Sequence, residues 1–318
     1  MPRVSALIPT YNRADYVGGA IETVLAQTYQ DIEAVVVNDG STDNTRDVLA
    51  EYADDERVQV HHNDQNQGIS YSFNRAAAEA RGELLCILGD DDRWHPEKIS
   101  KQVYRMGQLD ETYGVLYTGG VTTNNGKIVG VDRPSWQGDI YPEIIGAWEL
   151  NPHSSHMIRR EAFESVGGFD TDFPRCVDRE MCIRLAQEYR FDYLPELLVE
   201  RMIHGENISH EPEQANVNKM ILEKYGGELR EYPGVRRTLY ARWNQMQSTV
   251  AREHGDRWQG IKHSLAALRY RPTVFRVLLV VLAVLGSDVF EFGSTLRRGL
   301  RRAGMRATTD RFWTRTPS

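Results

Sequence analysis

Cysteine is scarce in this sequence of 318 residues, which contains only Cys86, Cys176 and Cys182. No C-x-x-C pair or Cys/His metal spacing accompanies these thiols. The scarcity excludes a disulfide-stapled scaffold and a zinc finger, and it predicts a reducing compartment. The first residues lack the long apolar stretch and small-residue cleavage site of a secretion signal, so none is expected. Stability must therefore come from a hydrophobic core, and the chain is long enough to form one.

The sequence also lacks an apolar run long enough to cross a bilayer. The best candidate, residues 274–285, contains Arg276 and is shorter than the ~20 residues that a spanning helix needs. Residues 296–302 then place arginines beside leucines, a pattern typical of membrane-surface helices. Net charge is divided unevenly, with −18 over residues 1–229 and +11 over residues 230–318. We expect a cytoplasmic protein whose C-terminal third binds the anionic inner face of the cell membrane; whether residues 274–292 insert stays open.

What is present along the first third is an alternation of strand and helix patterns. Short β-branched runs predict strands at residues 4–8, 33–38, 58–61 and 83–88. Helical spacing predicts helices at residues 16–26, with Asp15 as N-cap, and at 42–52 and 72–80. Such alternation predicts an α/β fold with a doubly wound, mostly parallel sheet.

The later sequence divides into two further parts. Residues 113–141 are rich in turn residues and predict hairpins, while 159–166 and 178–187 predict helices around a loop at 167–170. Beyond about residue 213 the pattern is helical and basic. We therefore predict a catalytic domain over 1–212, with halves 1–112 and 113–212, and a helical C-terminal region over 213–318.

Polar residues gather directly after the predicted strands, at positions 9–13, 39–42 and 89–92. Ligands of doubly wound sheets bind at the carboxyl ends of the strands. The run Asp90-Asp91-Asp92 would be costly without a cation, and its hard oxygens suit Mg²⁺ or Mn²⁺. The alternative is a solvated acidic turn. Asp39 could accept from a base or ribose hydroxyl, and Tyr11 could stack on a base, although each could also belong to an ordinary turn.

The set of motifs resembles family 2 of the glycosyltransferases in order and spacing, over roughly residues 1–210. The segments that carry the resemblance are Pro9-Thr10-Tyr11-Asn12, the run from Asn38 to Thr45, Asn66-Gln67-Gly68 with Asn74-Arg75, and Asp90–Asp92 with Trp94 and Pro96. The resemblance implies a GT-A fold, a nucleotide-sugar donor, a divalent metal and inversion at the anomeric carbon.

The resemblance also assigns roles to single residues. The nucleotide-sugar ligands that it implies are Pro9, Thr10, Tyr11, Arg13, Asp39, Asn66, Arg75 and Asp90, with Arg75 near the diphosphate or ribose. Asp91, Asp92 and His204 are the implied metal ligands, His204 standing where the family tends to have a basic loop beside the diphosphate. Family members often have Asp where this chain has Gly89, which leaves open which carboxylate of Asp90–Asp92 binds the metal.

The acceptor side of the resemblance lies in the second half. Gly167-Gly168-Phe169-Asp170, followed by the run from Val177 to Leu185, is similar to the family's G-G-F-D segment and its acidic helix. Alignment of Arg184-Leu185 places Asp178 at the position of the catalytic base, which would take the acceptor proton. Val177 replaces the usual Glu. The alternative interpretation of Asp178 is an N-cap for its helix.

We therefore predict an inverting transfer to a hydroxyl of a glycan or lipid-linked acceptor, in surface-polysaccharide or protein N-glycan assembly. A polyprenyl (dolichyl) phosphate sugar synthase is the main alternative, because its acceptor needs no base. A sugar nucleotidyltransferase would want a glycine-rich loop after the first strand, which residues 9–13 lack. The intact acidic run and Asp178 argue against a non-catalytic binding module. No nucleic-acid partner is expected, because no recognition motif accompanies the arginines.

Overall fold

The computed structural model describes residues 3–173, 176–204, 211–273, 276–277 and 280–281. The chain forms two compact units, the first made of residues 1–128 and 132–206, the second of residues 129–131 and 207–318. Each is described by itself. The sequence pattern at residues 296–302 and most of the apolar run at 274–285 lie outside the described residues.

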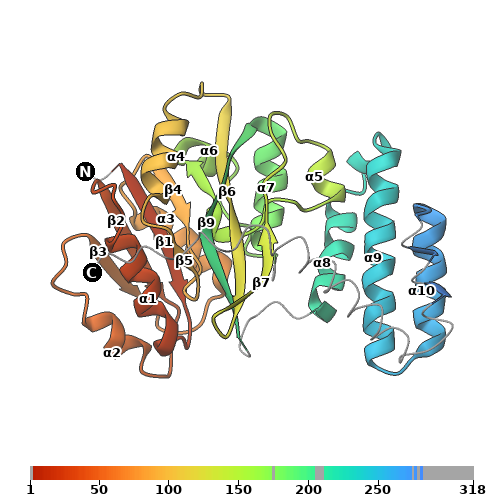
Figure 1. Ribbon diagram of the computed structural model, residues 1–318, viewed down its shortest axis with the longest axis horizontal. Helices are drawn as coiled ribbons and strands as arrows, with labels where there is room; N and C mark the ends of the chain where they lie inside the picture. The colour runs from red at the N-terminus through yellow and green to blue at the C-terminus, as the bar shows by residue number, and fades with distance from the viewer. Residues whose placement is uncertain (1–2, 174–175, 205–210, 274–275, 278–279, 282–318) are drawn as a thin grey trace. The chain divides into compact units, whose positions relative to one another are not determined.

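The first unit begins with the predicted alternation of strands and helices (Figure 1). Four strands pair in parallel in the order β3-β2-β1-β4: β1 (Val4–Thr10), β2 (Ile32–Asn38), β3 (Val58–His62) and β4 (Leu84–Ile87). The connecting helices are α1 (Ala14–Leu25), α2 (Thr45–Ala50) and α3 (Ile69–Glu79). Every residue of β1, β2 and β4 is buried, as expected for parallel strands covered on both faces. The α/β class and the mostly parallel sheet are confirmed.

The sheet continues with strands from the second half of the chain, in the order β4-β8-β6-β9-β5. The additional strands are β5 (Arg93–Trp94), β6 (Tyr113–Asn124), β7 (Lys127–Asp132), β8 (Met157–Arg159) and β9 (Arg190–Ile203). β8 is antiparallel to β4 and β6, β9 runs parallel to β6, β5 is antiparallel to β9, and β7 pairs with β6. The sequence analysis did not predict β9, whose run is interrupted by Pro195.

Shorter elements of the first unit are α4 (Lys98–Met106), α5 (Glu143–Gly146), the 3-10 turn η1 (His153–Ser155), α6 (Arg160–Ser165) and α7 (Val177–Glu188). Two capping predictions were wrong. Arg13, not Asp15, precedes α1, and Cys176, not Asp178, precedes α7. Asp15 and Asp178 instead lie in the first turns of their helices, where an anion stabilises the helix dipole. Residues 42–44 lie outside α2, because the loop before this helix bonds to the loop after β1.

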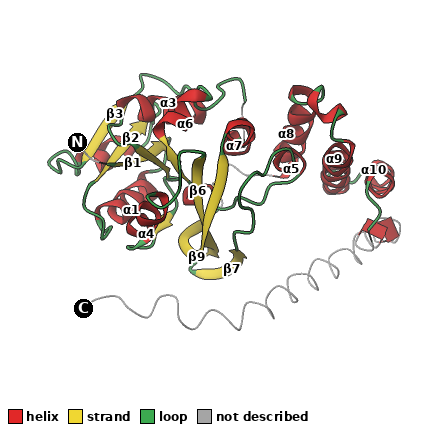
Figure 2. Cartoon of the chain, turned by 90° about the horizontal axis from the view of Figure 1, so that it is seen from above, coloured by secondary structure: helices red, strands yellow, loops and turns green. Residues whose placement is uncertain are grey.

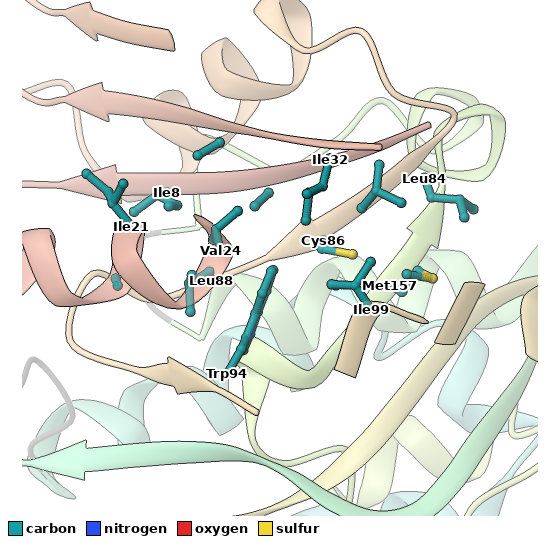
Figure 3. Close-up of a cluster of buried hydrophobic side chains, with 14 of the residues drawn as sticks. Ile8, Ile21, Val24, Ile32, Leu84, Cys86, Leu88, Trp94, Ile99 and Met157 are labelled. Carbon is teal, nitrogen blue, oxygen red and sulfur yellow. The ribbon is translucent and has the colours of Figure 1, made fainter. Parts of the chain in front are cut away.

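A hydrophobic cluster packs α1 and α4 against the sheet. Figure 3 shows Ile21 of α1 beside Ile8 of β1, Trp94 near Leu88, and Ile99 beside Cys86 and Met157. All of these side chains are buried. Because this core contains residues from β1, β4, β5 and α4, it fixes the loop at residues 89–92 relative to the sheet.

Apart from residues 129–131 of β7, the second unit is helical in its described part. Its elements are α8 (Glu211–Lys224), the 3-10 turn η2 (Glu228–Arg230), α9 (Pro233–Glu253) and α10 (Arg257–Tyr270). Figure 2 shows α9 and α10 side by side. Their contact uses small polar residues, with the Ser248 Oγ donating to the Gly260 carbonyl at 2.8 Å and lying 2.7 Å from the Ser264 Oγ. Among the described residues, no helix is both long and apolar enough to cross a membrane.

Candidate active site

The loop after β1 is hydrogen-bonded to the loop after β2. Thr10 and Asn38 are register partners at the strand ends, and the Asp39 N–H donates to the Thr10 carbonyl at 2.8 Å. Asn12 adopts the left-handed conformation with φ 53°. There its N–H donates to the Ser41 Oγ at 2.9 Å and its Oδ1 accepts from the Thr42 N–H at 2.8 Å. The two loops, which carry most of the nucleotide ligands implied by the sequence, therefore meet at one edge of the sheet.

Asp39 organises the next loop along this edge. Its Oδ1 accepts from the Asn63 side-chain amide at 2.6 Å and from the Gln67 N–H at 2.9 Å, and its Oδ2 accepts from the Gly68 N–H at 2.9 Å. The residue is 3% exposed. Residues 65–68 are consequently held against the end of β2.

Gly40 makes this close approach possible. It has φ +71°, and a Cβ would lie 2.6 Å from the Gln65 carbonyl carbon. Only glycine meets both conditions without strain. The Asn66 side chain, exposed on the same loop, accepts from the Gly68 N–H at 3.1 Å.

Arg75 is anchored beneath the same loop. Its Nη1 donates to the His62 carbonyl at 2.7 Å and to the Asn63 Oδ1. Asn63 thus joins Asp39 to Arg75, so a carboxylate and a guanidinium are fixed beside each other at the ends of β2 and β3. The sequence analysis missed Asn63, which belongs to none of the motifs it used.

The three aspartates after β4 have different surroundings. Asp91 faces His204, with its Oδ2 3.0 Å from the His204 Nε2, and the His204 ring stacks on Tyr16 at 4.2 Å between centroids. Asp92 is buried: its Oδ2 accepts from the Ser154 hydroxyl and its Oδ1 from the Met202 N–H at 3.3 Å. The structure therefore brings Asp91 and His204 together, and it ties Asp92 to η1 and β9.

The electrostatics of the acidic loop favour an additional positive charge. Burial, reinforced by the charge of Asp91, raises the pKa of Asp90 to about 7 and that of Asp92 to about 8. Arg13 offsets part of the shift at Asp90, and Arg201 does so at Asp92. A cation bound beside Asp91 would favour the ionised form of both neighbours.

Arg93 supplies a fixed positive charge close to these carboxylates. Its Nη1 donates to the Asp92 carbonyl at 2.8 Å and its Nη2 to the Tyr16 carbonyl at 3.3 Å. The guanidinium lies over Gly19, where a Cβ would come within 2.1 Å of Nη2. The second glycine of α1 therefore makes room for this side chain.

The residues that the sequence analysis assigned to the acceptor side lie around η1 and α7. Ser154 of η1 donates to the Asp92 carboxylate. Burial lowers the pKa of the neighbouring His153, and the charge of Asp178 offsets part of this lowering. The His153 Nε2 is buried and has no hydrogen-bond partner among the described residues. The turn thus links the acidic loop to the surroundings of Asp178.

Glu180, one turn along α7 from Cys176, has a different environment. Arg184 donates to the Glu180 carboxylate from Nε to Oε1 at 2.9 Å and from Nη2 to Oε2 at 2.6 Å. The same Nη2 also donates to the Gly168 carbonyl at 2.7 Å. Glu180 is fully buried. This pair stabilises the loop before α7, and it leaves Asp178 as the partly exposed carboxylate at the start of the helix.

The loop at residues 167–170 is fastened to α3 by Asn74. The Asn74 Nδ2 donates to the Phe169 carbonyl and its Oδ1 accepts from the Phe169 N–H, both at 2.8 Å. A Cβ on Gly168 would lie 2.5 Å from that Oδ1. Asn74 therefore connects the donor half to the acceptor half, a function that the motif alone did not reveal.

Residues 5–167, about half of the chain, match the family model described as Glycosyl transferase family 2. The chain belongs to glycosyltransferase family 2. The resemblance deduced from the sequence is thereby confirmed.

Curated relatives agree with this assignment. An uncharacterized glycosyltransferase from Nostoc sp. is 35% identical over 64% of this chain and 66% of its own length. A chondroitin synthase from Pasteurella multocida is 29% identical over 66% of this chain and 21% of its own length. The chain therefore spans less than two thirds of the length of these relatives.

Among solved structures, the mannosyltransferase PcManGT from Pyrobaculum calidifontis, in complex with GDP-Man and Mn²⁺, aligns with a TM-score of 0.58. The alignment covers 97% of this chain and 88% of that one at 19% identity. At that identity the likeness shows the fold alone, and the GT-A fold is confirmed.

In this glycosyltransferase, the departure at Gly89 has a packing reason. A Cβ at Gly89 would lie 3.2 Å from the Asp91 Oδ1 and 3.3 Å from the Asp92 Oδ2. A fourth carboxylate would therefore enter a group in which the charge of Asp91 already adds to the raised pKa of Asp90 and of Asp92. The Gly89 N–H instead donates to the Ser154 Oγ at 2.9 Å, which adds a second bond between this loop and η1.

Proposed function

We propose that the enzyme transfers a sugar, with inversion, from a nucleotide diphosphate donor to an acceptor hydroxyl, and that Asp178 is the general base. The observation that carries this proposal is the contrast on α7. Glu180 is buried in its pair with Arg184, whereas Asp178 lies partly exposed in the first turn.

The donor half supports the remainder of the reaction. The edge formed by Thr10, Asp39 and Arg75 offers acceptors for a base and ribose and a guanidinium for the diphosphate. A preorganised positive charge beside a leaving diphosphate stabilises the charge that develops as the glycosidic bond breaks. Because Asn63 and the backbone hold Asp39 and Arg75, little reorganisation is needed when the donor binds.

Asp91 and His204 fit a divalent cation, Mg²⁺ or Mn²⁺. The described residues contain no group of three or more His, Cys, Asp or Glu that could hold a metal alone. Such cations in nucleotide sites commonly take one or two protein ligands and complete their shell with substrate phosphates and water. When bound, the metal would supply positive charge to the leaving diphosphate. The PcManGT structure contains Mn²⁺ with GDP-Man, which supports this choice.

The acceptor that we propose is a hydroxyl of a lipid-linked glycan, at the inner face of the cell membrane. The +11 charge of residues 230–318 supports an anionic membrane partner. A chondroitin synthase among the relatives supports a sugar hydroxyl as acceptor and surface-polysaccharide or glycoprotein-glycan assembly as the setting. The alternative, a polyprenyl phosphate acceptor, would need no proton acceptor.

The test is Asp178→Asn. It keeps the shape of the side chain and removes its basicity, so kcat should fall by a factor on the order of 10²–10⁴ while donor affinity remains close to that of the parent. Transfer with a panel of nucleotide sugars in Mn²⁺ measures kcat, and calorimetry measures donor affinity. Asp172→Asn, an exposed residue before the same helix, is the matched control.

An Asp178→Asn enzyme that transfers at the parental rate to a hydroxyl acceptor would refute the assignment of the base. Parental transfer to a polyprenyl phosphate would instead establish the alternative reaction.

A further inference from the structure

The outer face of α10 combines exposed apolar and cationic side chains in one line. Trp258, Lys262, Leu265 and Arg269 are spaced four, three and four residues apart, so they lie on the same side of the helix. Trp258 is 80% exposed and Leu265 50% exposed. The buried residues of α10, Gly260, Ser264 and Ala267, occupy the opposite side, where α9 packs.

The charge along this segment has one sign. Between Arg257 and Thr273 the sequence contains four cations and no carboxylate. The four cationic side chains, Arg257, Lys262, Arg269 and Arg271, are all exposed. Beyond the helix, Val277 and Val281 are also exposed, at 48% and 45%. Apolar and cationic side chains therefore alternate along the outer face of α10.

This alternation fits an anionic lipid surface better than other occupants. Tryptophan and leucine enter the boundary between headgroups and acyl chains, while Lys and Arg extend to lipid phosphates. A second copy docked on the same face by twofold symmetry would bring the four cations of each copy together. A nucleic acid would use the cations, but it would leave Leu265 and Val277 without a partner.

We propose that the outer face of α10 is a docking surface for anionic phospholipid. It is built from Trp258, Lys262, Leu265 and Arg269, and it precedes the apolar run at residues 274–285. This inference rests on the membrane association in the proposed function, and it names the surface that makes the contact. The apolar pair provides binding that resists salt, and the cationic pair provides selectivity for anionic headgroups.

The experiment compares variants of the full-length enzyme on vesicles of phosphatidylcholine with and without phosphatidylserine. Trp258→Ser with Leu265→Ser should weaken binding to the anionic vesicles by at least about tenfold, because two apolar side chains lose their burial. Lys262→Gln with Arg269→Gln should weaken it by about tenfold at low salt and much less at high salt. Tyr104→Ser with Lys219→Gln, exposed residues of α4 and α8, should bind as the parent does.

Trp258→Phe provides a second measurement, since it keeps an apolar ring. This variant should bind like the parent but lose part of the fluorescence quenching by brominated lipid. Transfer of sugar to a soluble acceptor should be unchanged in every variant, which also shows that each one folds.

Two results would overturn the docking surface. One is equal vesicle affinity of the parent and both double variants, which would leave membrane association to other residues. The other is a dimer of the parent that both double variants abolish in sedimentation, with no effect on vesicles. A parent that binds no anionic vesicle would refute membrane association as well, while sugar transfer to a soluble acceptor would remain an independent result.

Discussion

At the scale of single residues, Asp91 differs from its two neighbours. The Asp92 carboxylate accepts hydrogen bonds from Ser154 and Met202. Burial raises the pKa of Asp90, and the charge of Arg13 offsets part of this rise. The Asp91 carboxylate instead faces the His204 ring. Adjacent carboxylates in one loop therefore have different surroundings. Asp91 is the one whose surroundings suit a cation that the donor diphosphate shares.

Asp91→Asn should abolish metal-dependent donor binding and reduce turnover to near background, because an amide is a weaker ligand for a hard cation. Folding should be retained, since the substitution hardly changes volume, and circular dichroism checks this. Asp54→Asn, at an exposed position after α2, serves as the control. Full activity of Asp91→Asn, or of the parent enzyme in EDTA, would sink the metal hypothesis.

The sequence predicts that polar and acidic residues lie at the strand ends, but it does not predict how the surroundings of the individual aspartates differ. Buried β-branched runs that end in Asp39 or Asp90 indicate which carboxylates reach the ligand edge. The partners that distinguish Asp92 from Asp91 come from Ser154 and Met202, far along the chain. No local pattern around residue 92 contains that information, and the same holds for the bonds of Asn63.

At the scale of elements, α1 and β5 make a close contact between Gly19 and the Arg93 guanidinium. Replacement of a helical glycine by alanine ordinarily stabilises a protein by up to about 1 kcal/mol. Gly19→Ala should do the reverse, because the new methyl group displaces Arg93 from the Asp92 and Tyr16 carbonyls.

We expect Gly19→Ala to lose roughly 1–3 kcal/mol of unfolding free energy and to bind the donor several-fold more weakly. Urea unfolding and calorimetry measure the two effects. Gly234→Ala in α9, where nothing lies within 4 Å of the new methyl, should be neutral or stabilising. Similar stability changes in both variants would contradict the contact.

Helix α4 contains a buried lysine whose titration affects stability. The Lys98 Nζ lies 4.1 Å from the Trp94 ring centroid, donates to the Gln102 Oε1 at 2.7 Å and is shielded from solvent. Burial lowers the pKa of Lys98 to about 8, whereas the pKa of a lysine in the unfolded chain is about 10.4. Between these values unfolding takes up a proton, so the stability of the fold rises with pH there.

The unfolding free energy of the parent should therefore increase, relative to that of Lys98→Met, by up to about 3 kcal/mol between pH 7 and pH 10. Below pH 8 the cost of the buried charge is fully present, and the difference should be constant. Urea unfolding at several pH values measures it, with Lys219→Met, an exposed position on α8, as the control. A parallel pH dependence of parent and Lys98→Met would contradict this account.

Among the elements, the first four strands were predictable and β9 was not. Strands β1, β2 and β4 consist mainly of apolar residues, and β3 begins with Val58 and Val60 on either side of Gln59. By contrast, β9 contains Pro195 and several charged residues, and its register with β6 shifts at Thr118/Gly119 and Gly119/Gly120. A strand with such an irregular burial pattern, paired with a partner distant in sequence, depends on tertiary pairing more than on local preference.

At the scale of the whole molecule, we expect the catalytic unit to perform the chemistry and the basic C-terminal region to bind the membrane. A chain ending at residue 270 retains α10 but lacks the apolar run at 274–285. It should leave anionic vesicles at a lower salt concentration than the full chain does, because it keeps the apolar and cationic side chains of the α10 face but loses the apolar run. The full chain should resist salt and yield to detergent.

Vesicle flotation at low and high salt measures this difference, and transfer to a soluble acceptor shows that the shortened chain is active. Equal salt resistance of the two chains would show that residues 271–318 contribute nothing to membrane binding.

The hydrogen bonds of Asp92 also determine when the acidic loop is complete during synthesis. Its carboxylate joins three segments, and the last of them, at Met202, lies 110 residues downstream. During synthesis the first four strands can pair as they leave the ribosome, but the acidic loop receives this bond only after β9 has emerged. Until then the Asp92 carboxylate lacks its bond to the Met202 N–H and the nearby charge of Arg201. A nascent chain that stops before β9 would thus possess the sheet edge that carries Asp39 and Arg75 before its acidic loop is fixed, so the two parts of the proposed donor site would form at different times.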